Sequence, residues 1–281
     1  MKASPVSVEP ESAAKGAVNE EPILLRSRDS RGVVTLTLNR PNAFNALSEA
    51  TLAALQREMD EIAQEKSVRV VVLAAAGKAF CAGHDLKEMR AAPSLEYYER
   101  LFAQCSDMML AIQKLPVPVI ARVQGIATAA GCQLVAMCDL AVASSTAKFA
   151  VSGVNLGLFC SAPGVALSRN LLRKAAFEML VTGEFINAEE AKARGLINRV
   201  AEPDQLDAEL ENLVAAIVAK PRIAVAMGKQ FFYRQLELGI AAAYEAASQT
   251  MACNMMKEAA LEGVQAFIEK RPPRWSKPAE R

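Results

Sequence analysis

The stretch from Val117 to Ser144, VPVIARVQGIATAAGCQLVAMCDLAVAS, decides how this chain folds. It opens with a β-branched run to Val123, passes through a turn of small residues, and takes on apolar helical spacing from about Cys132. A short strand is predicted over residues 140–143. Where a strand ends in alanine and glycine and a helix follows, the first backbone N–H groups of the helix have no intrahelical acceptor. The stretch therefore predicts either an anion-binding turn or an ordinary strand-to-helix connection.

A second segment has the same organisation. A buried strand is predicted over residues 68–74, and the small-residue turn Cys81-Ala82-Gly83-His84-Asp85 then precedes a helix. Small side chains allow other groups to approach the backbone closely. Two such turns placed side by side would supply a pair of N–H donors, which is the arrangement that stabilises an oxyanion or a thioester enolate.

The other patterns alternate strands with helices and predict an α/β layer architecture. Ser48 is expected to begin a helix that buries Leu52, Leu55, Met59 and Ile62 on one face. A longer helix is predicted over residues 95–114, and a short one capped by Asn187 precedes a strand over residues 196–200. From Pro203 onward only helical spacing is found, so the chain is expected to end in helices.

Composition excludes several classes of protein. The 281 residues are 52% hydrophobic with a net charge of +1, which favours a large core in one broad domain and gives no reason to expect nucleic acid or an anionic membrane as a partner. No apolar run is long enough to predict a membrane span. Six cysteines without a CxxC pair indicate reduced thiols and a cytoplasmic location. Residues 1–21 are predicted to be a disordered tail, and their glutamates argue against a mitochondrial presequence.

Taken together, these segments resemble the crotonase superfamily, also called the enoyl-CoA hydratase/isomerase superfamily. The matching segments are Asn39-Arg40-Pro41 with Asn45-Ala46-Leu47, Phe80 to Met89, Gln124 to Asp139, Thr182-Gly183-Glu184, Ala188 to Val200 and Glu262 to Arg271. They follow the family's order from about Val33 to the C-terminus. The resemblance implies a spiral of ββα repeats over residues 22–202 and a helical oligomerisation region over residues 203–281. It also implies assembly as a homotrimer or a dimer of trimers.

The same resemblance implies a site for an acyl-CoA or enoyl-CoA thioester, with coenzyme A as part of the substrate and no prosthetic group. The backbone N–H groups of His84 and Ala130 would form the oxyanion hole. Because His84 is the only histidine, a histidine-rich metal site is excluded. Its imidazole either packs within the turn or faces the thioester. The implied CoA contacts are Asn42, Ala43, Phe44 and Ala82, with Phe267 and Lys270 reaching from a neighbouring subunit.

Two positions depart from the pattern of hydratases in this family. Those enzymes use two glutamates, because hydration of a conjugated double bond needs a base for water and an acid for the α-carbon. The corresponding residues in this chain are Gln133 and Gly153. Glutamine can orient water or a substrate, but it takes up no proton at neutral pH. We therefore expect inefficient hydration.

Three functions remain open from the sequence. One is a hydratase/isomerase-type enzyme whose acid and base have moved, the nearby acids being Asp139, Glu88, Glu178 and Glu184. Another is a thioester isomerase or hydrolase, for which Cys160 and Ser161 are conceivable nucleophiles. The third is a non-catalytic acyl-CoA-binding relative. Asp85 is expected to cap the following helix, and Asp139 is expected to be structural. A GxSxG elbow, a dinucleotide fingerprint and a P-loop are all absent from the sequence.

Overall fold

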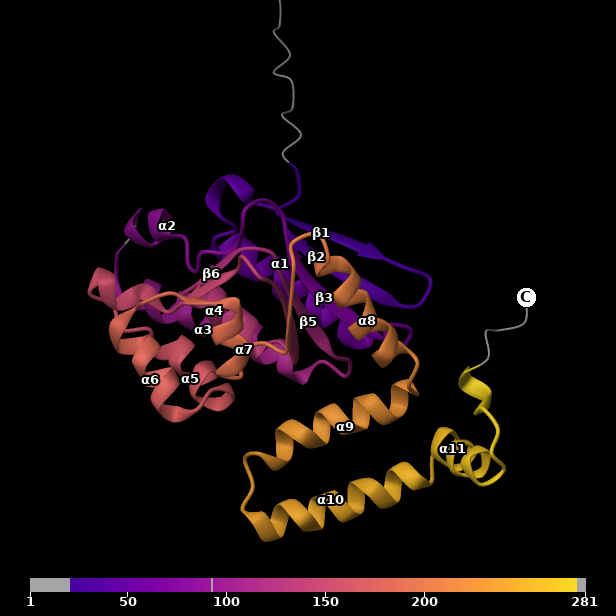
Figure 1. Cartoon of the computed structure of the whole chain (residues 1–281). Coiled ribbons are helices and arrows are strands. Elements are labelled where there is room, and N and C mark those ends of the chain that lie inside the picture. Colours follow the sequence, from indigo (N-terminus) through magenta and orange to yellow (C-terminus); the bar gives the residue numbers. More distant parts are fainter. Residues whose placement is uncertain (1–20, 92, 277–281) are drawn as a thin grey trace, which may run out of the picture.

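The computed structural model describes residues 21–91 and 93–276, which form two β-sheets surrounded by helices (Figure 1). The larger sheet has the strand order β1-β2-β3-β5-β7-β10, and the smaller has the order β4-β6-β8-β9. The disordered tail predicted for residues 1–21 lies, except for Glu21, outside the described residues.

The strands of the larger sheet are β1 (Leu24–Arg28), β2 (Val33–Leu38), β3 (Val70–Ala75), β5 (Val119–Val123), β7 (Leu140–Ser144) and β10 (Arg199–Ala201). Those of the smaller sheet are β4 (Ala79–Cys81), β6 (Ile126–Thr128), β8 (Lys148–Ala150) and β9 (Ile186–Asn187). Only the β1–β2 and β8–β9 pairs are antiparallel. The sheets are therefore mixed, with parallel strands at their centres.

The α-helices are α1 (Glu49–Gln64), α2 (Leu86–Ala91), α3 (Leu95–Lys114), α4 (Ala130–Met137), α5 (Ser161–Asn170), α6 (Arg173–Thr182), α7 (Ala188–Ala193), α8 (Leu206–Val218), α9 (Arg222–Gln235), α10 (Ile240–Met255) and α11 (Glu258–Ile268). Three 3₁₀ turns are η1 (Pro41–Ala43), η2 (Ser152–Leu156) and η3 (Arg274–Ser276). Ser48 accepts a hydrogen bond from the Thr51 N–H and so caps α1, and Asn187 caps α7 through the Glu190 N–H. Both caps agree with the sequence patterns.

The chain alternates between the two sheets as it advances. Strands β3, β5 and β7 lie in the larger sheet, and each is followed by a short strand, β4, β6 or β8, in the smaller sheet. A helical segment then returns the chain to the next pair of strands. This is the predicted spiral of ββα repeats. Its consequence is that β4, β6 and β8, although far apart in sequence, end side by side.

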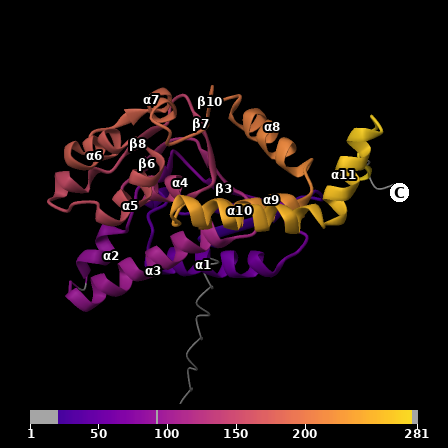
Figure 2. The same cartoon turned by 90° about the horizontal axis from the view of Figure 1, so that it is seen from below.

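The larger sheet is covered on both faces. One face packs against the apolar sides of α1, α3 and α4, and the other packs against α8 through Leu206, Leu213 and Val214. Figure 2 shows α8 on one side of the strands and α1 and α3 on the other. The central strand β3 is buried at every residue. This explains its continuous apolar sequence, since a parallel strand covered on both faces has no solvent side.

Helices α9, α10 and α11 extend away from the sheets as a helical arm (Figures 1 and 2). The arm is attached to the core by Lys229 on α9, whose Nζ donates to Asp139 Oδ2 at 2.7 Å and to the carbonyls of Ile112 and Val117. Asp139 also accepts from the Tyr233 hydroxyl at 2.8 Å and from the Val119 N–H. Asp139 is therefore structural, as the sequence predicted.

Strands β1, β4, β6, β8 and β9 were missing from the sequence-based prediction, and β4 and β6 are the two that position the candidate site. Strand β6 lies within the segment predicted as a turn between Gly125 and Gly131, and β4 lies in front of the Ala82–Asp85 turn. Both have only three residues, so neither shows a recognisable period. Helix α4 also begins at Ala130, two residues before Cys132, and the strand predicted over 196–200 begins at Arg199. None of the helices in the described part of the chain is long and apolar enough to cross a membrane.

Candidate active site

The two small-residue turns of the sequence lie next to each other in space. Strands β4 and β6 are parallel neighbours, with Ala79 opposite Ile126 and Cys81 opposite Ala127. Their carboxyl ends therefore meet at one edge of the smaller sheet, which is where parallel sheets usually bind ligands. The turn around Gly83 follows β4, and the turn around Ala129 follows β6. The segments that the sequence singled out are thus brought together by pairing of two short strands.

Each turn presents one backbone N–H without an acceptor among the described residues. Leu47 forms a parallel bridge with His84, in which it bonds to the Gly83 carbonyl and the Asp85 N–H. In a parallel bridge of this kind, the hydrogen bonds are made by the residues on either side of His84, so the N–H of His84 itself points away from Leu47. Ala130 is the first residue of α4, so its N–H has no intrahelical partner. Both amides are free to donate to a ligand.

Glycine at positions 83 and 131 allows the turns to approach this closely. A methyl group added to Gly83 would lie 3.2 Å from the Ala130 nitrogen and 2.9 Å from the Ala129 Cβ. One added to Gly131 would lie 2.1 Å from the Cys81 carbonyl oxygen. Gly83 also has a φ of +92°, which side chains disfavour. The small residues were predicted to let a ligand approach the backbone. The structure shows that they let the two turns approach each other.

Ala129 holds a strained conformation directly before the second donor. Its φ is +51° and its ψ is −123°, a region that non-glycine residues rarely occupy and that costs on the order of 1–3 kcal/mol. The surrounding structure fixes it: the Ala129 N–H donates to the Ala150 carbonyl, and Thr128 Oγ1 and Ser152 Oγ are 2.9 Å apart. This conformation of Ala129 bends the chain sharply between β6 and α4, which begins at Ala130.

A network of polar side chains supports the first turn. Buried Asn45 donates to the carbonyls of Ala76 and Ala79, and the Arg40 guanidinium bonds Asp85 Oδ2 at 3.0 Å. Asp85 also accepts from the N–H groups of Lys87 and Glu88, so it caps α2 as predicted. Burial acts to raise the pKa of Asp85, but the hydrogen bonds and charge of Arg40 and the N–H groups of Glu88 and Lys87 outweigh it, so this pKa lies below its usual range. The turn around Gly83 is therefore supported by Asn45 before it and by the Arg40–Asp85 pair after it.

The imidazole of His84 packs within the fold. Its ring lies edge-on to Phe102 of α3, with ring centroids 5.4 Å apart. Burial lowers its pKa, against a hydrogen bond with the Leu47 backbone that acts in the opposite direction. Nδ1 is buried without a hydrogen-bond partner among the described residues. Of the two roles considered from the sequence, the ring's contact with Phe102 favours the packing role.

Gln133 stands in the first turn of α4, three residues after Ala130. It is only 5% exposed, and its Oε1 is buried with no partner in the described chain. Helical side chains tilt toward the N-terminus of their helix, so the amide of Gln133 leans back toward the end of α4 at which the Ala130 N–H lies. An unpartnered buried acceptor in the same helical turn as an unpartnered donor makes the start of α4 a candidate position for a polar ligand.

Gly153 has no room for a side chain. A methyl group there would lie 2.5 Å from the Leu158 carbonyl oxygen and 2.6 Å from the Cys160 sulfur. The first carbon of any side chain at position 153 would thus collide with Cys160 and the Leu158 carbonyl. Burial raises the pKa of the Cys160 thiol, and this disfavours the thiolate that a nucleophile requires. Ser161 is exposed, and its hydroxyl donates to the Phe159 carbonyl at 3.5 Å.

The other acids considered from the sequence are mostly engaged elsewhere. Asp139 binds Lys229 and Tyr233, Glu88 accepts from the Glu49 N–H, and Glu178 pairs with Arg194. Glu184 is exposed after the end of α6. Three of these four carboxylates therefore have partners that hold them in structural roles.

The expected CoA contacts fall into two groups. Asn42, Ala43 and Phe44 form the η1 turn and its end, and the Phe44 carbonyl accepts from the Ala82 N–H at 3.0 Å, next to the first donor turn. Phe267 belongs to α11 and Lys270 follows the end of this helix. In both views α11 lies on the opposite side of the molecule from α2 and β6 (Figures 1 and 2). One chain by itself does not bring the two groups together.

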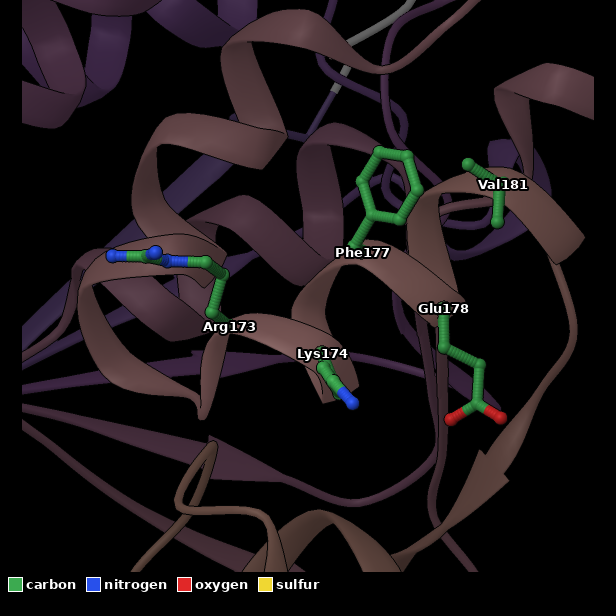
Figure 3. Close-up of a pocket in the computed structure, with 5 residues that line it drawn as sticks. All are labelled: Arg173, Lys174, Phe177, Glu178 and Val181. Carbon is green, nitrogen blue, oxygen red and sulfur yellow. The ribbon is translucent and has the colours of Figure 1, made fainter.

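Two hollows on the surface lie outside this site. One, of about 510 Å³, is lined by Arg173, Lys174, Phe177, Glu178 and Val181, all on α6 (Figure 3). Another, of about 860 Å³, lies between α1 and α3 and includes Gln56 and Gln104. Neither contains a residue of the two donor turns. We place the candidate site at the turns, because two backbone amides and the Gln133 oxygen there lack partners among the described residues, whereas the larger hollow offers only the Gln56 oxygen.

Comparison with known proteins agrees with this architecture. A family model described as enoyl-CoA hydratase/isomerase matches residues 28–278. The Rattus norvegicus protein named enoyl-CoA hydratase domain-containing protein 3, mitochondrial, is 45% identical over 267 residues, which cover 95% of this chain and 89% of that protein. The crystal structure of an enoyl-CoA hydratase from Mycobacterium smegmatis is 71% identical with a TM-score of 0.91, covering 92% of this chain and 100% of that one.

The crystal structure of human enoyl-CoA hydratase domain-containing protein 3 is 43% identical with a TM-score of 0.87, covering 90% of this chain and 100% of that one. The likeness thus extends over nearly all of the chain in both sequence and fold. The residues matched by the family model, 28–278, include the two donor turns, α4 and the helical arm. The chain belongs to the enoyl-CoA hydratase/isomerase family.

Proposed function

We propose that this protein is a CoA-thioester enzyme that stabilises a thioester enolate with the backbone N–H groups of His84 and Ala130. The observation that carries this proposal is the pair of unpartnered amides, in turns so close that a methyl group added to Gly83 would meet Ala129 and Ala130. Donors preorganised around an oxygen that gains negative charge lower the barrier to enolate formation, since they need no reorganisation during the reaction.

Gln133 and Gly153 set the limits of this chemistry. We infer that they replace the two glutamates with which hydratases of the family move protons. The oxyanion hole would then be retained while both proton carriers are lost. Each lost carrier is expected to reduce hydration by about a hundredfold to ten-thousandfold. The reaction that fits best is therefore one of the hydratase/isomerase type in which the thioester is polarised and water addition is slow.

The enzyme proposal is tested by two measurements on the purified protein. Calorimetry measures binding of a short acyl-CoA, and spectrophotometry follows loss of a short 2-enoyl-CoA. We expect clear binding with slow hydration, and faster hydration by Gln133→Glu, which restores one carboxylate. A wild type that binds no CoA thioester would overturn the proposal, as would binding that is insensitive to disruption of the donor turns.

A non-catalytic acyl-CoA-binding protein is the second candidate, and it is favoured by the structural engagement of Asp139, Glu88 and Glu178. It predicts the same calorimetric binding. It differs in that no thioester is consumed, either by hydration, by isomerisation of the double bond or by hydrolysis. Chromatography of a mixture of CoA thioesters after long incubation separates the two candidates.

We also propose that the site is completed by assembly into a homotrimer or a dimer of trimers. Supporting this, the helical arm exposes large apolar side chains, including Ile240 at 78%, Met256 at 76% and Phe267 at 86%. Exposed apolar faces of this kind are typical of subunit contacts. Sedimentation analysis gives the mass, and a monomer would remove Phe267 and Lys270 from the CoA site. A cytoplasmic location remains a proposal, testable by cell fractionation, whereas the rat relative is named mitochondrial.

A further inference from the structure

Among the residues that the structure describes, Lys229 of α9 is the only charged residue that is buried, with 8% of its surface exposed. An ammonium group has three N–H donors, and burying it is costly unless they are used. Its Nζ donates to Asp139 Oδ2 at 2.7 Å, to the Ile112 carbonyl at 2.9 Å and to the Val117 carbonyl at 3.0 Å. All three donors are therefore used, and each binds a different segment of the core.

The contact with Ile112 closes the C-terminal end of α3. In a longer helix this carbonyl would accept from the residue four places on, but that residue is Pro116, which has no N–H. The Lys229 ammonium supplies the missing donor, and a cation is favourable at the negative end of a helix dipole. Further toward the N-terminus of α3, the Phe102 ring lies edge-on to the His84 ring. Lys229 thus holds the helix that packs against the first donor turn.

The contact with Asp139 fixes the base of the segment that carries the second donor. Asp139 follows the C-terminal end of α4, and its Oδ2 accepts both from Lys229 and from the N–H of Val119, the first residue of β5. One carboxylate therefore joins the two ends of residues 119–139. Ala130 lies at the opposite end of α4, whose eight residues span about 12 Å.

Both helices are packed closely enough to transmit a displacement from one end to the other. The inner face of α3 lies in the main hydrophobic core, and α4 is buried at each residue from Ala130 to Ala136. A close-packed interior has low compressibility, so a helix that is displaced at one end moves as a body. Misplacement of a catalytic group by about 1 Å can reduce a rate by about a hundredfold.

We propose that Lys229 is a positioning residue for the oxyanion hole. Its ammonium holds the C-terminal ends of α3 and α4, and so keeps the N–H groups of His84 and Ala130 directed at the same thioester oxygen. This inference rests on the proposed function. It adds the connection by which the helical arm, whose other end carries Phe267, sets the geometry of the site.

The test measures polarisation of the thioester carbonyl directly. Butyryl-CoA with an isotopic label at its carbonyl carbon is bound to the full chain, and infrared difference spectroscopy records its C=O stretching frequency. Hydrogen bonds from the two donors should lower this frequency in wild type relative to free butyryl-CoA. In Lys229→Met the lowering is expected to be smaller, because the donors no longer converge on one oxygen.

Binding and turnover of the same variant are expected to respond differently. The dissociation constant of butyryl-CoA, measured by calorimetry, should stay close to that of wild type, because Lys229 is not among the expected CoA contacts. For a 2-enoyl-CoA, kcat should fall by about tenfold to a hundredfold with less change in KM. Loss of stability alone would leave both the carbonyl frequency and kcat of the folded protein unchanged.

Arg222→Met is the matched control. Arg222 is also a partly buried cation on α9, and its Nε donates to the Val68 carbonyl at 2.8 Å, away from α3 and α4. Both variants are expected to lower the melting temperature, but only Lys229→Met should change the carbonyl frequency and kcat. Equal changes in both variants would assign the effect to general loosening of the arm and overturn the inference.

Tyr233→Phe decides the matter if Lys229→Met does not fold. This variant removes the hydroxyl that donates to Asp139 Oδ1 at 2.8 Å and leaves Lys229 in place. We expect it to change the carbonyl frequency in the same direction and by less. An unchanged frequency would then overturn the inference.

The outcomes also separate this inference from the proposed function. If wild type lowers the carbonyl frequency and folded Lys229→Met lowers it equally, the oxyanion hole stands and the role of Lys229 is wrong. If wild type binds butyryl-CoA without lowering the frequency, or does not bind it, the hole itself is refuted and the inference with it.

Discussion

Helix α4 has a polar side chain near each end, buried Gln133 and partly buried Asp139, and the two differ in how their oxygens are hydrogen-bonded. Asp139, just beyond the C-terminal end, accepts hydrogen bonds from Val119, Lys229 and Tyr233. Gln133, in the first turn, has no partner for its Oε1 in the part of the chain that is described. A polar group buried with all its partners stabilises the fold, and one buried without them is available to a ligand.

The two ends also differ in backbone strain and charge. The N-terminal end follows the positive φ of Ala129 and presents a free N–H, whereas at the C-terminal end the Cys138 N–H donates back to Leu134 and Val135. Burial lowers the pKa of Lys229, although the neighbouring Asp139 acts in the opposite direction. The same short helix thus carries a structural anchor for the arm at one end and, at the other, the unpaired polar groups of the proposed binding site.

The largest change in stability is expected at Asp139, beyond the C-terminal end of α4. Asp139→Ala would leave the Lys229 ammonium buried without its carboxylate, so we expect the free energy of unfolding to fall by about 3–5 kcal/mol. Urea denaturation measures this change. The control is Asp207→Ala, which breaks an exposed pair with Arg122 and should cost less than about 1 kcal/mol. Equal losses in the two variants would contradict the contrast between the ends.

In the turn next to the N-terminal end of α4, Gly83→Ala is expected to separate the N–H groups of His84 and Ala130. The added methyl group would meet Ala129 and Ala130, so turnover of a CoA thioester should fall by about a hundredfold to a thousandfold with smaller loss of stability. Gly157→Ala is the matched control, because Gly157 has a similar positive φ of +78° but nothing within 4 Å of the added methyl. A comparable loss of turnover in both variants would show that strain alone, and not the contact, is responsible.

A smaller effect of opposite sign is expected for Gln133→Met. Removing an unpaired buried amide should raise the free energy of unfolding by about 1 kcal/mol, since no hydrogen bond is lost with it. Urea denaturation of wild type and variant measures this difference in the free energy of unfolding. Reduced stability would place Gln133 with Asp139 among the structural residues and remove the comparison between the two ends.

The smallest effect concerns pH. Burial lowers the pKa of His84 below its ordinary value of 6.5, so the folded protein favours the neutral ring. The unfolded chain then binds more protons as the pH falls, and stability present above about pH 6.5 is lost below it. Because the chain has one histidine, His84→Phe, which keeps a ring against Phe102, should flatten this step in unfolding curves. An unchanged step would assign it to another group.

Much of the fold was predictable from the sequence because its signals are local. The apolar spacing of α1 and α3, the caps at Ser48 and Asn187, and the helical C-terminal region follow from period and turn chemistry. Strands β4 and β6 were missed because three residues establish no period. The likeness to the enoyl-CoA hydratase/isomerase family supplied the arrangement that such short strands cannot indicate.

By itself, the sequence determined which residue types are present at the candidate site: small residues at both turns, an uncharged amide at Gln133, and no side chain at Gly153. Only the tertiary structure decided how they combine. Pairing of β4 with β6 places two amides together, Cys160 fills the space at Gly153, and the Gln133 oxygen is left unpaired. The physical reason is that hydrogen-bond satisfaction and excluded volume depend on neighbours distant in sequence, whereas propensity and periodicity depend on neighbours along the chain.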